Sequence, residues 1–254
     1  MMTLRLRRTL PDATMFVPRF FERSPLFWPV LPAARVFEDH MDWPSVDTYG
    51  RVFRDAVAPV SFVPSTEPIR KRGEPIDPKA LYDGRIVHAR EVPTRPRSWH
   101  DFMNALVWAT FPQAKLALHG RQHVAVAERV VPGATVLPNA RTRELDILAL
   151  IDEGGVILLA TGNVRRSLVF GHALYEGMVL EQRATMARAV YVDGPETESE
   201  LLAMTERELV AHADAALAAI VADRKNDLIV PDPSSRIGIA TLVAELEALG
   251  SRQA

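Results

Sequence analysis

The sequence predicts a mainly helical α+β protein with a small antiparallel sheet built on a central β-hairpin and a proline-rich N-terminal segment that wraps around the core. Two apolar, β-rich runs, Leu145–Ile151 and Val156–Ala160, flank Asp152-Glu153-Gly154-Gly155, where glycines supply the positive φ of a tight turn. Long stretches after this hairpin have the apolar periodicity of helices. Thirteen of the 19 prolines lie between Pro11 and Pro96, so the first third is expected to be loop-rich with short helices only.

The proline-rich first third also carries many aromatic side chains, which a solvated loop would not need. We therefore expect residues 1–80 to dock on a core formed elsewhere rather than to fold as an independent domain. The chain, 1–254, is predicted to form a single globular domain, with its core over 81–192 and C-terminal helices over 193–254. The aromatic residues of the docking segment are Phe16, Phe20, Phe21, Phe27, Trp28, Phe37, Trp43, Tyr49 and Phe53.

Local patterns predict the elements that follow. A short strand is expected within Leu81–Val92, ended by Pro93. Helices are expected over 99–110, 113–123, 170–192 and 200–222 because apolar residues recur there at helical spacing. After a proline turn at Pro231, a short amphipathic helix is expected over 239–249.

Composition excludes several classes of protein. Thirty basic residues against 32 acidic ones give a formal net charge of -2, so nucleic acid is not an expected partner. The sequence contains no cysteine, which excludes disulfides and thiolate metal sites and favours a cytoplasmic location. No apolar run approaches the ~18–20 residues of a membrane span, so we expect a soluble protein without a membrane partner. The expected partner is a small-molecule ligand.

The segment from Ser98 is the first candidate site. Ser98 with Asp101 three residues on is similar to a capping box and predicts a helix over Trp99–Thr110. On this helix His100 and Asn104 are one turn apart on one face, and Asp101 lies in the first turn, where the helix dipole favours a carboxylate. His100, Asp101 and Asn104 would supply a base, an acid and an amide, and are the candidate catalytic residues. Alternatively, Asp101 only caps the helix and His100 donates to a nearby carbonyl.

An arginine pair before the predicted hairpin is a candidate anion site. Alternation in a strand would place Arg141, Arg143 and Leu145 on one face, where the guanidinium groups can hold a carboxylate or a phosphate. Arg143 can equally pair with Asp146 or Asp101 as a structural contact.

His119 and His123 have the helical spacing at which two imidazoles bind one metal ion. No acidic residue stands between them, and Gly120 can end the helix, so two solvent-facing histidines are the alternative. The chain lacks the glycine patterns of nucleotide-binding loops and the Gly-x-Ser-x-Gly motif of a nucleophile elbow. No metal ligand set is predicted, and the cofactor stays unspecified.

The same residues carry a resemblance to a known family. Tyr82, Arg85 and the run Trp99–Lys115 are similar to a Tyr and an Arg followed by Trp-His-Asp-x-x-Asn-Ala-Leu-Val-Trp-x-x-Phe-Pro-x-x-Lys. Leu145–Gly155 is similar to the family's Arg-Asp-x-Leu-x-x-Phe-Asp-Glu-x-Gly, with Leu145 in place of the arginine and Ile151 in place of the aromatic residue. The stretch His172–Glu176 is similar to its His-x-Leu-Tyr-Glu.

Over about residues 80–180 the chain thus resembles the bacterial family known as domain of unknown function 3025. The resemblance implies no activity, but it marks signature positions, several of them polar where packing alone needs no polar group. These positions are Tyr82, Arg85, His100, Asp101, Asn104, Asp146, His172 and Glu176.

Two functional hypotheses of different classes are open. In the first, the protein binds a small molecule or is a hydrolase-like enzyme, with His100 as general base and Asp101 or Glu176 orienting it. Arg85 or Arg143 would hold an anionic or amide-bearing substrate, and the expected substrate-binding residues are Tyr82, Arg85, Arg143, His172 and Glu176. In the second, the signature residues form a buried network in a non-catalytic binding or scaffold protein. A metal-bound variant would use His119, His123 or His172; the oligomeric state is open.

Overall fold

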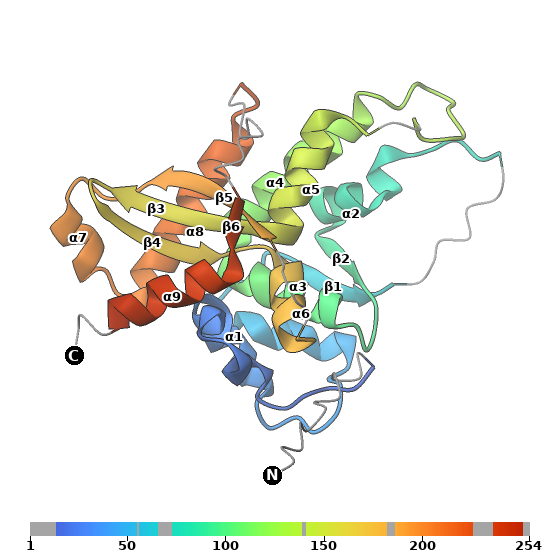
Figure 1. Ribbon diagram of the computed structural model, residues 1–254. Coiled ribbons are helices and arrows are strands. Elements are labelled where there is room, and N and C mark those ends of the chain that lie inside the picture. The colour runs from blue at the N-terminus through green and yellow to red at the C-terminus, as the bar shows by residue number, and fades with distance from the viewer. Residues whose placement is uncertain are drawn as a thin grey trace, which may run out of the picture.

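The computed structural model describes residues 14–54, 56–65, 73–138, 141–181, 186–225 and 236–250. The chain is mainly helical with two small sheets, so the predicted α+β class is confirmed (Figure 1). The strands are β1 (Ser61–Pro64), β2 (Glu91–Thr94), β3 (Gly155–Thr161), β4 (Val164–Val169), β5 (Met186–Asp193) and β6 (Arg236–Gly238). The α-helices are α1 (Leu31–Ala34), α2 (Tyr82–Ala89), α3 (Trp99–Thr110), α4 (Pro112–Ala127), α5 (Arg143–Gly154), α6 (His172–Val179), α7 (Glu198–Ala203), α8 (Glu206–Ala222) and α9 (Ile239–Gly250). Short 3₁₀ helices span Phe20–Arg23, Pro25–Val30, Arg35–Phe37, Val46–Phe53 and Pro78–Ala80.

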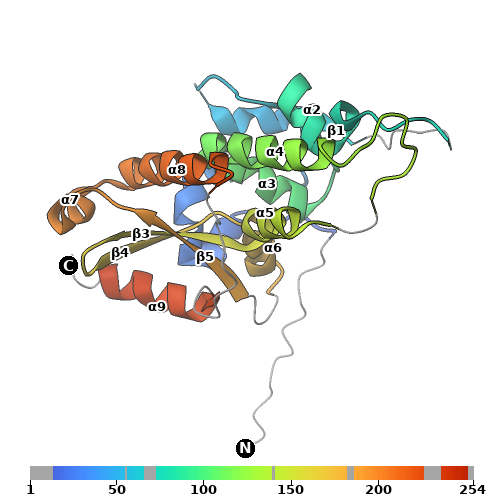
Figure 2. The ribbon, with the colours of Figure 1, turned by 90° about the horizontal axis from the view of Figure 1, so that it is seen from above.

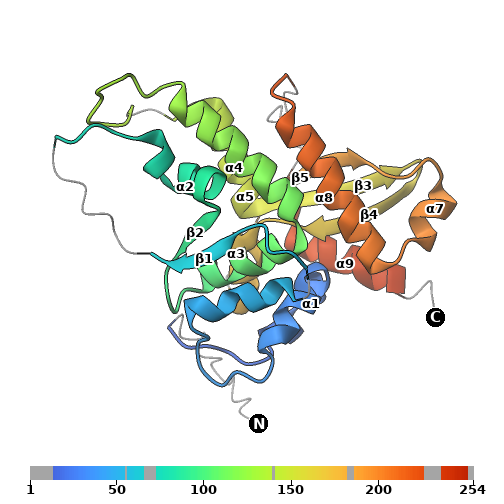
Figure 3. The same ribbon diagram turned by 180° about the vertical axis from the view of Figure 1, so that it is seen from behind.

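The larger sheet lies between helices and has the strand order β4-β3-β5-β6. Strand β3 pairs antiparallel with β4 and parallel with β5, and β5 pairs antiparallel with β6. Helix α8 runs along one face of this sheet and α9 along the other (Figure 2), and the view from behind shows α8 in front of the strands (Figure 3). The sheet is therefore mixed rather than purely antiparallel, because the segment carrying β4 and α6 connects two parallel neighbours. Strands β1 and β2 form a separate parallel pair.

One arm of the predicted hairpin is wrong. Leu145–Ile151 lies in helix α5, because the side chain of Thr142 accepts a hydrogen bond from the Leu145 backbone N–H at 3.2 Å and caps a helix there. Leu145, Leu148 and Ile151 are then buried at helical spacing, whereas Leu150 is exposed. Val156–Ala160 does form a strand, β3, but it pairs with β4 through a turn at Gly162, whose φ is 56°.

Gly171, directly before α6, packs against the end of α5, whereas Gly155 is crowded by the last turn of its own helix. A Cβ on Gly155 would lie 2.5 Å from the carbonyl oxygen of Ile151, and one on Gly171 would lie 2.5 Å from the carbonyl oxygen of Glu153. Only glycine permits such close backbone approach. The last residues of α5 and the first residues of α6 therefore lie side by side, although a hairpin separates them in sequence.

Two further element predictions are wrong. The strand expected within Leu81–Val92 is helix α2 followed by β2, and Arg90, with a φ of 57°, ends the helix. Pro93 lies inside β2, which accommodates it because β2 pairs with β1 alone. The helix expected over Phe170–Val192 is the short helix α6 followed by strand β5, in which Ala187, Ala189, Val190 and Val192 are buried.

The other helices agree better with the sequence. Helix α3 spans 99–110 as predicted, and α4 includes 113–123 but continues to Ala127. The segment 200–222 falls in α7 and α8, which begin separately with capping boxes at Thr197 and Thr205. Helix α9 includes 239–249, whereas the expected turn at Pro231 lies outside the described residues.

The N-terminal aromatic residues pack on helix α3, which holds its Phe102 ring fully buried. Trp99, at the start of α3, stacks on Phe16 at 5.3 Å between ring centroids and donates its indole N–H to the Met15 carbonyl at 3.2 Å. The docking segment therefore fixes the start of α3. That the whole chain forms a single domain stays a prediction. The Phe102 ring centroid lies 5.2–6.3 Å from those of Phe16, Phe20, Phe37, Trp43 and Tyr49.

Replacing Asp214 with alanine is expected to lower the free energy of unfolding by about 1–3 kcal/mol, because two backbone donors, one of them buried, lose their acceptor. The carboxylate of Asp214, on α8, accepts hydrogen bonds from Gln113 N–H at 3.1 Å and Ala114 N–H at 2.8 Å, in the first turn of α4. Urea unfolding of the variant measures the loss. Asp214→Asn, which keeps an acceptor oxygen, should lose less; an equal loss in both variants would contradict the capping role.

Candidate functional site

Helix α3 presents His100 and Asn104 toward the helices opposite it, as the sequence predicts. The Ser98 side chain accepts a hydrogen bond from the Asp101 backbone N–H at 3.3 Å and starts the helix, so His100 and Asn104 are one turn apart on one face. Because the aromatic packing around Trp99 anchors the first turn of α3, the backbone that carries these two side chains is held in place.

Three side chains from three helices converge beside this face. The Nε2 atom of His100, on α3, lies 3.0 Å from Nε2 of His172, on α6. Glu153, at the end of α5, places one carboxylate oxygen 3.8 Å from Nε2 of His100 and the other 3.5 Å from Nε2 of His172. Among the described residues, these three form the group whose nitrogen and oxygen atoms, all within 4.8 Å of one another, can surround one metal ion.

A second layer of carboxylates lies near the outward nitrogens of the two histidines, but only Glu176 is within hydrogen-bond distance, and Nδ1 of His172 has no hydrogen-bond partner among the described residues. Glu176 lies 3.1 Å from Nδ1 of His100, and Asp152 lies 3.8 Å from Nδ1 of the buried His172. Asp152 is itself paired at 2.5 Å with the Nζ atom of Lys115, a lysine with no exposed surface. Carboxylates in this position orient imidazoles and make them better ligands.

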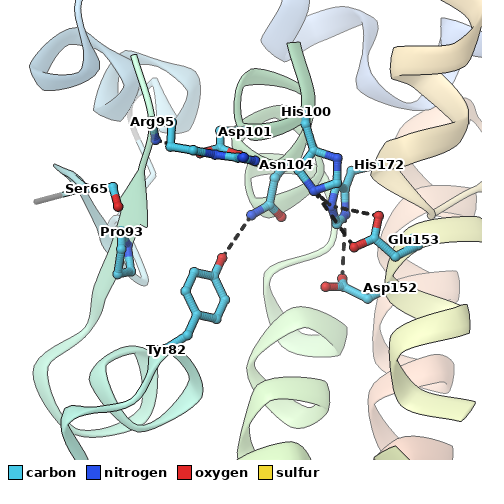
Figure 4. Close-up of a pocket in the computed structure, with 10 residues that line it drawn as sticks. All are labelled: Ser65, Tyr82, Pro93, Arg95, His100, Asp101, Asn104, Asp152, Glu153 and His172. Atoms are coloured by element: carbon cyan, nitrogen blue, oxygen red, sulfur yellow. Dashed lines mark hydrogen bonds and ion pairs between the residues drawn. The ribbon is translucent and has the colours of Figure 1, made fainter. Parts of the chain in front are cut away.

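The cluster opens into a pocket of about 290 Å³, a size at the lower end for small-molecule sites. The Asn104 amide nitrogen donates to the Tyr82 hydroxyl at 3.3 Å, and the Asn104 side chain lies between Tyr82 and the two histidines (Figure 4). Asp101, at the pocket edge, is held by Arg95, whose Nη2 donates to it at 2.7 Å. The lining residues are Ser65, Tyr82, Pro93, Arg95, His100, Asp101, Asn104, Asp152, Glu153 and His172.

Burial and charge separate the protonation states of the two histidines. Burial lowers the pKa of His172 to about 3, so its imidazole is neutral at physiological pH. The hydrogen bond to Glu176 raises the pKa of His100, against the opposing effect of burial. Burial raises the pKa of Glu153. Burial also opposes ionisation of Asp152, but Lys115, His172 and His119 together outweigh it and lower the pKa of Asp152.

The structure brings six of the eight predicted site residues together, Asp101 among them, and leaves two outside. Tyr82, His100, Asn104 and His172 line the pocket, and Glu176 contacts His100 from behind. Arg85 pairs with Glu91 at 2.7 Å and does not line the pocket. Arg143 is exposed in the first turn of α5, so the strand face predicted for it does not exist.

Asp101 lines the pocket but contacts Arg95 and not His100, so Glu176 is the carboxylate that meets the imidazole. Asp146, the remaining signature acid, is exposed and lies 3.7 Å from Arg141 on the surface of α5. Neither residue therefore orients His100.

His119 and His123 point in different directions despite their spacing. His119 is buried and pairs with Asp83 at 2.9 Å, so the expectation that both face solvent is wrong for this residue. His123 instead meets His88 of α2, with 3.0 Å between their Nε2 atoms. The two residues therefore do not share a ligand position.

Sequence reasoning missed Glu153, Asp152, Lys115 and Arg95 as site residues. A signal was present for three of them: the Asp-Glu pair and the final Lys belong to the patterns of the family that the chain resembles. The signal at Asp152-Glu153 was missed because these residues were interpreted as a hairpin turn, which would place their carboxylates in solvent. They lie instead at the end of α5, which places the carboxylates beside the two histidines.

Comparison with known proteins supplies a family but no function. No curated protein and no solved structure matches this chain. The described residues contain no helix that is both long and apolar enough to cross a membrane. The matched part of the chain includes α2 to α5 and strands β2 and β3, and hence Tyr82, His100, Asn104 and Glu153 but not His172. Residues 69–166 match the family model described as "Protein of unknown function (DUF3025)", and the predicted resemblance is thereby confirmed.

Proposed function

We propose that this protein binds one divalent transition-metal ion through His100, His172 and Glu153 and hydrolyses a small molecule held in the adjacent pocket. The observation that carries the proposal is the convergence of three side chains. The Nε2 atoms of His100 and His172 lie 3.0 Å apart, and the two carboxylate oxygens of Glu153 lie 3.8 Å from the first and 3.5 Å from the second. Two imidazoles and one carboxylate are a ligand set of catalytic zinc sites, which leave a position open for water or substrate.

The surroundings of the three ligands support a cation at this place. Four carboxylates, of Asp101, Asp152, Glu153 and Glu176, lie around the histidines, and within the described parts of the chain they pair with two cationic side chains, Arg95 and Lys115. A divalent ion would balance the excess of negative charge. Imidazole ligands favour zinc, copper, iron or nickel over magnesium and calcium.

A metal ion of this kind lowers the pKa of a bound water molecule to about 7 and supplies hydroxide at neutral pH. The role of the surrounding residues is to orient the two imidazole ligands. Glu176 fixes the imidazole of His100, and Asp152, which Lys115 holds in place, faces the outward nitrogen of His172. The pocket beside them is lined by Tyr82 and Asn104, which contact the substrate in this proposal. His100 thereby acts as a ligand and not as the general base of the first hypothesis.

Metal binding by the purified full chain tests the proposal. Titration with Co²⁺ is expected to produce a visible absorption spectrum that saturates at one equivalent, and zinc should displace the cobalt. Glu153→Gln and His172→Ala should each weaken cobalt binding by about 10–100-fold or more, because each removes a ligand. Glu153 is 48% exposed in its side chain, so its variant is expected to fold.

The histidine pair on the surface is a matched control. His88 and His123 also place their Nε2 atoms 3.0 Å apart, but they do not belong to a group of three metal-ligating residues within the described parts of the chain. The double variant His88→Ala/His123→Ala should keep the saturable cobalt spectrum. If the spectrum is missing from the unmodified protein, or is lost only in this double variant, the site at His100 is refuted.

A non-catalytic role is the alternative that the contacts also allow, because the bonds of His100 to Glu176 and His172 join α3 to α6. In that case His100→Ala would lower the melting temperature, and no metal would bind. A cytoplasmic location and a small-molecule ligand also belong to this proposal.

A further inference from the structure

We infer that the substrate of this site presents an uncharged amide group, which Asn104 and Tyr82 recognise beside the metal ligands. This inference rests on the proposed hydrolytic function and adds the class of substrate. The observation behind it is that Asn104, only 7% exposed, lines the pocket while its carbonyl oxygen Oδ1 has no hydrogen-bond partner. A buried acceptor without a partner is costly, so the site is built to receive a donor from a ligand.

Asn104 and Tyr82 together offer one acceptor and one donor. The Asn104 amide nitrogen donates to the Tyr82 hydroxyl oxygen, so the hydroxyl proton of Tyr82 and the Oδ1 of Asn104 remain for a ligand. Burial, and after it the negative charge of Asp152, raises the pKa of the Tyr82 phenol, so the hydroxyl keeps its proton. If the Asn104 amide is turned by 180°, the pair still presents one donor and one acceptor.

This pattern matches an amide, which carries a carbonyl acceptor and an N–H donor side by side. A carboxylate or a phosphate would need donors only. The cationic groups nearest to the pocket are already engaged, since Arg95 donates two side-chain hydrogen bonds to Asp101, and Lys115 is paired with Asp152. Among the described residues that line the pocket, an anionic substrate would therefore meet carboxylates and no unengaged arginine, whereas a neutral amide has its partners in place.

The corresponding reaction is amide hydrolysis. The oxygen of water forms a bond to the carbonyl carbon, the C–N bond breaks, and the leaving amine takes up a proton from the water. The new carboxylic acid releases its remaining proton, so the products at neutral pH are a carboxylate and a protonated amine. Every atom comes from the amide and one water molecule, and no oxidant or reductant takes part.

The test uses the cobalt-loaded full chain and two small probes that change the cobalt spectrum when they reach the metal. Acetohydroxamate carries a carbonyl group and an N–H, whereas acetate has the same methyl and carbonyl carbons but no N–H. Asn104→Leu removes the acceptor and Tyr82→Phe removes the donor. Asn104→Leu is expected to bind acetohydroxamate about tenfold more weakly, the equivalent of one hydrogen bond, while its dissociation constant for acetate stays unchanged. Tyr82→Phe is expected to weaken the binding of both probes, because the oxygen atoms of both accept a hydrogen bond from the phenol.

The outcomes separate the two proposals. In Asn104→Leu, equal weakening of both probes or no weakening of either overturns the amide inference while the metal site stands, and so does unchanged binding of both probes to Tyr82→Phe. A loss of cobalt affinity in Asn104→Leu also overturns it, because Asn104 would then serve the metal and not the substrate. No cobalt spectrum in the unmodified protein overturns the proposed function, and the amide inference falls with it.

Discussion

Replacing Lys115 with methionine is expected to lower the free energy of unfolding by about 3–5 kcal/mol, the cost of leaving a buried charge without its partner. Lys115 has no exposed surface, its Nζ atom meets Asp152 at 2.5 Å, and the same Nζ lies 5.5 Å from the centre of the Trp108 ring. Methionine keeps the length and packing of the side chain, so the decrease in unfolding free energy measures the effect of removing the charge. Urea unfolding followed by circular dichroism measures it.

Two variants show whether the ion pair is the cause. Lys115→Met combined with Asp152→Asn removes both charges and should recover most of the lost stability, because a buried pair is often replaceable by uncharged groups. Lys79→Met on the exposed surface should change stability by no more than about 0.5 kcal/mol. If the double variant is as unstable as Lys115→Met, the unpaired carboxylate is not the origin of the effect.

Zinc at about 1,000 times its dissociation constant is expected to raise the free energy of unfolding by about 4 kcal/mol, because the ion binds the folded chain and not the unfolded one. For a chain of this length that corresponds to a rise of the melting temperature by about 8–16 °C. Differential scanning calorimetry with and without zinc measures it. The ligands come from α3, α5 and α6, so the ion would join three helices that are far apart in sequence.

The controls for this result are specific to the site. Glu153→Gln should lose most of the rise, and the His88→Ala/His123→Ala variant should keep it, since the surface pair has only two imidazoles. Magnesium should have little effect, because it prefers oxygen ligands. A zinc-induced rise that persists in Glu153→Gln, or vanishes in the surface variant, would refute the assignment of the ligands.

Local sequence signals were sufficient to predict the half of the site that lies on helix α3. The N-cap at Ser98 and the helical spacing of the following residues predict that His100 and Asn104 share a face, and both signals act within one or two turns. The run Leu145–Ile151 misled the prediction because a short apolar segment fits a strand and a buried helix equally well. The cap at Thr142 and the packing beneath α5 decide for the helix.

The sequence by itself determined the α+β class, the helix that carries His100 and the family resemblance, because each depends on residues close together in the chain. Only the tertiary structure decided that His172, 72 residues from His100, meets it at 3.0 Å, and that Glu153 completes the cluster. The physical reason is that Gly171, which has no side chain, lets the start of α6 pack backbone to backbone against the end of α5. Such a contact between distant segments leaves no periodic pattern along the chain.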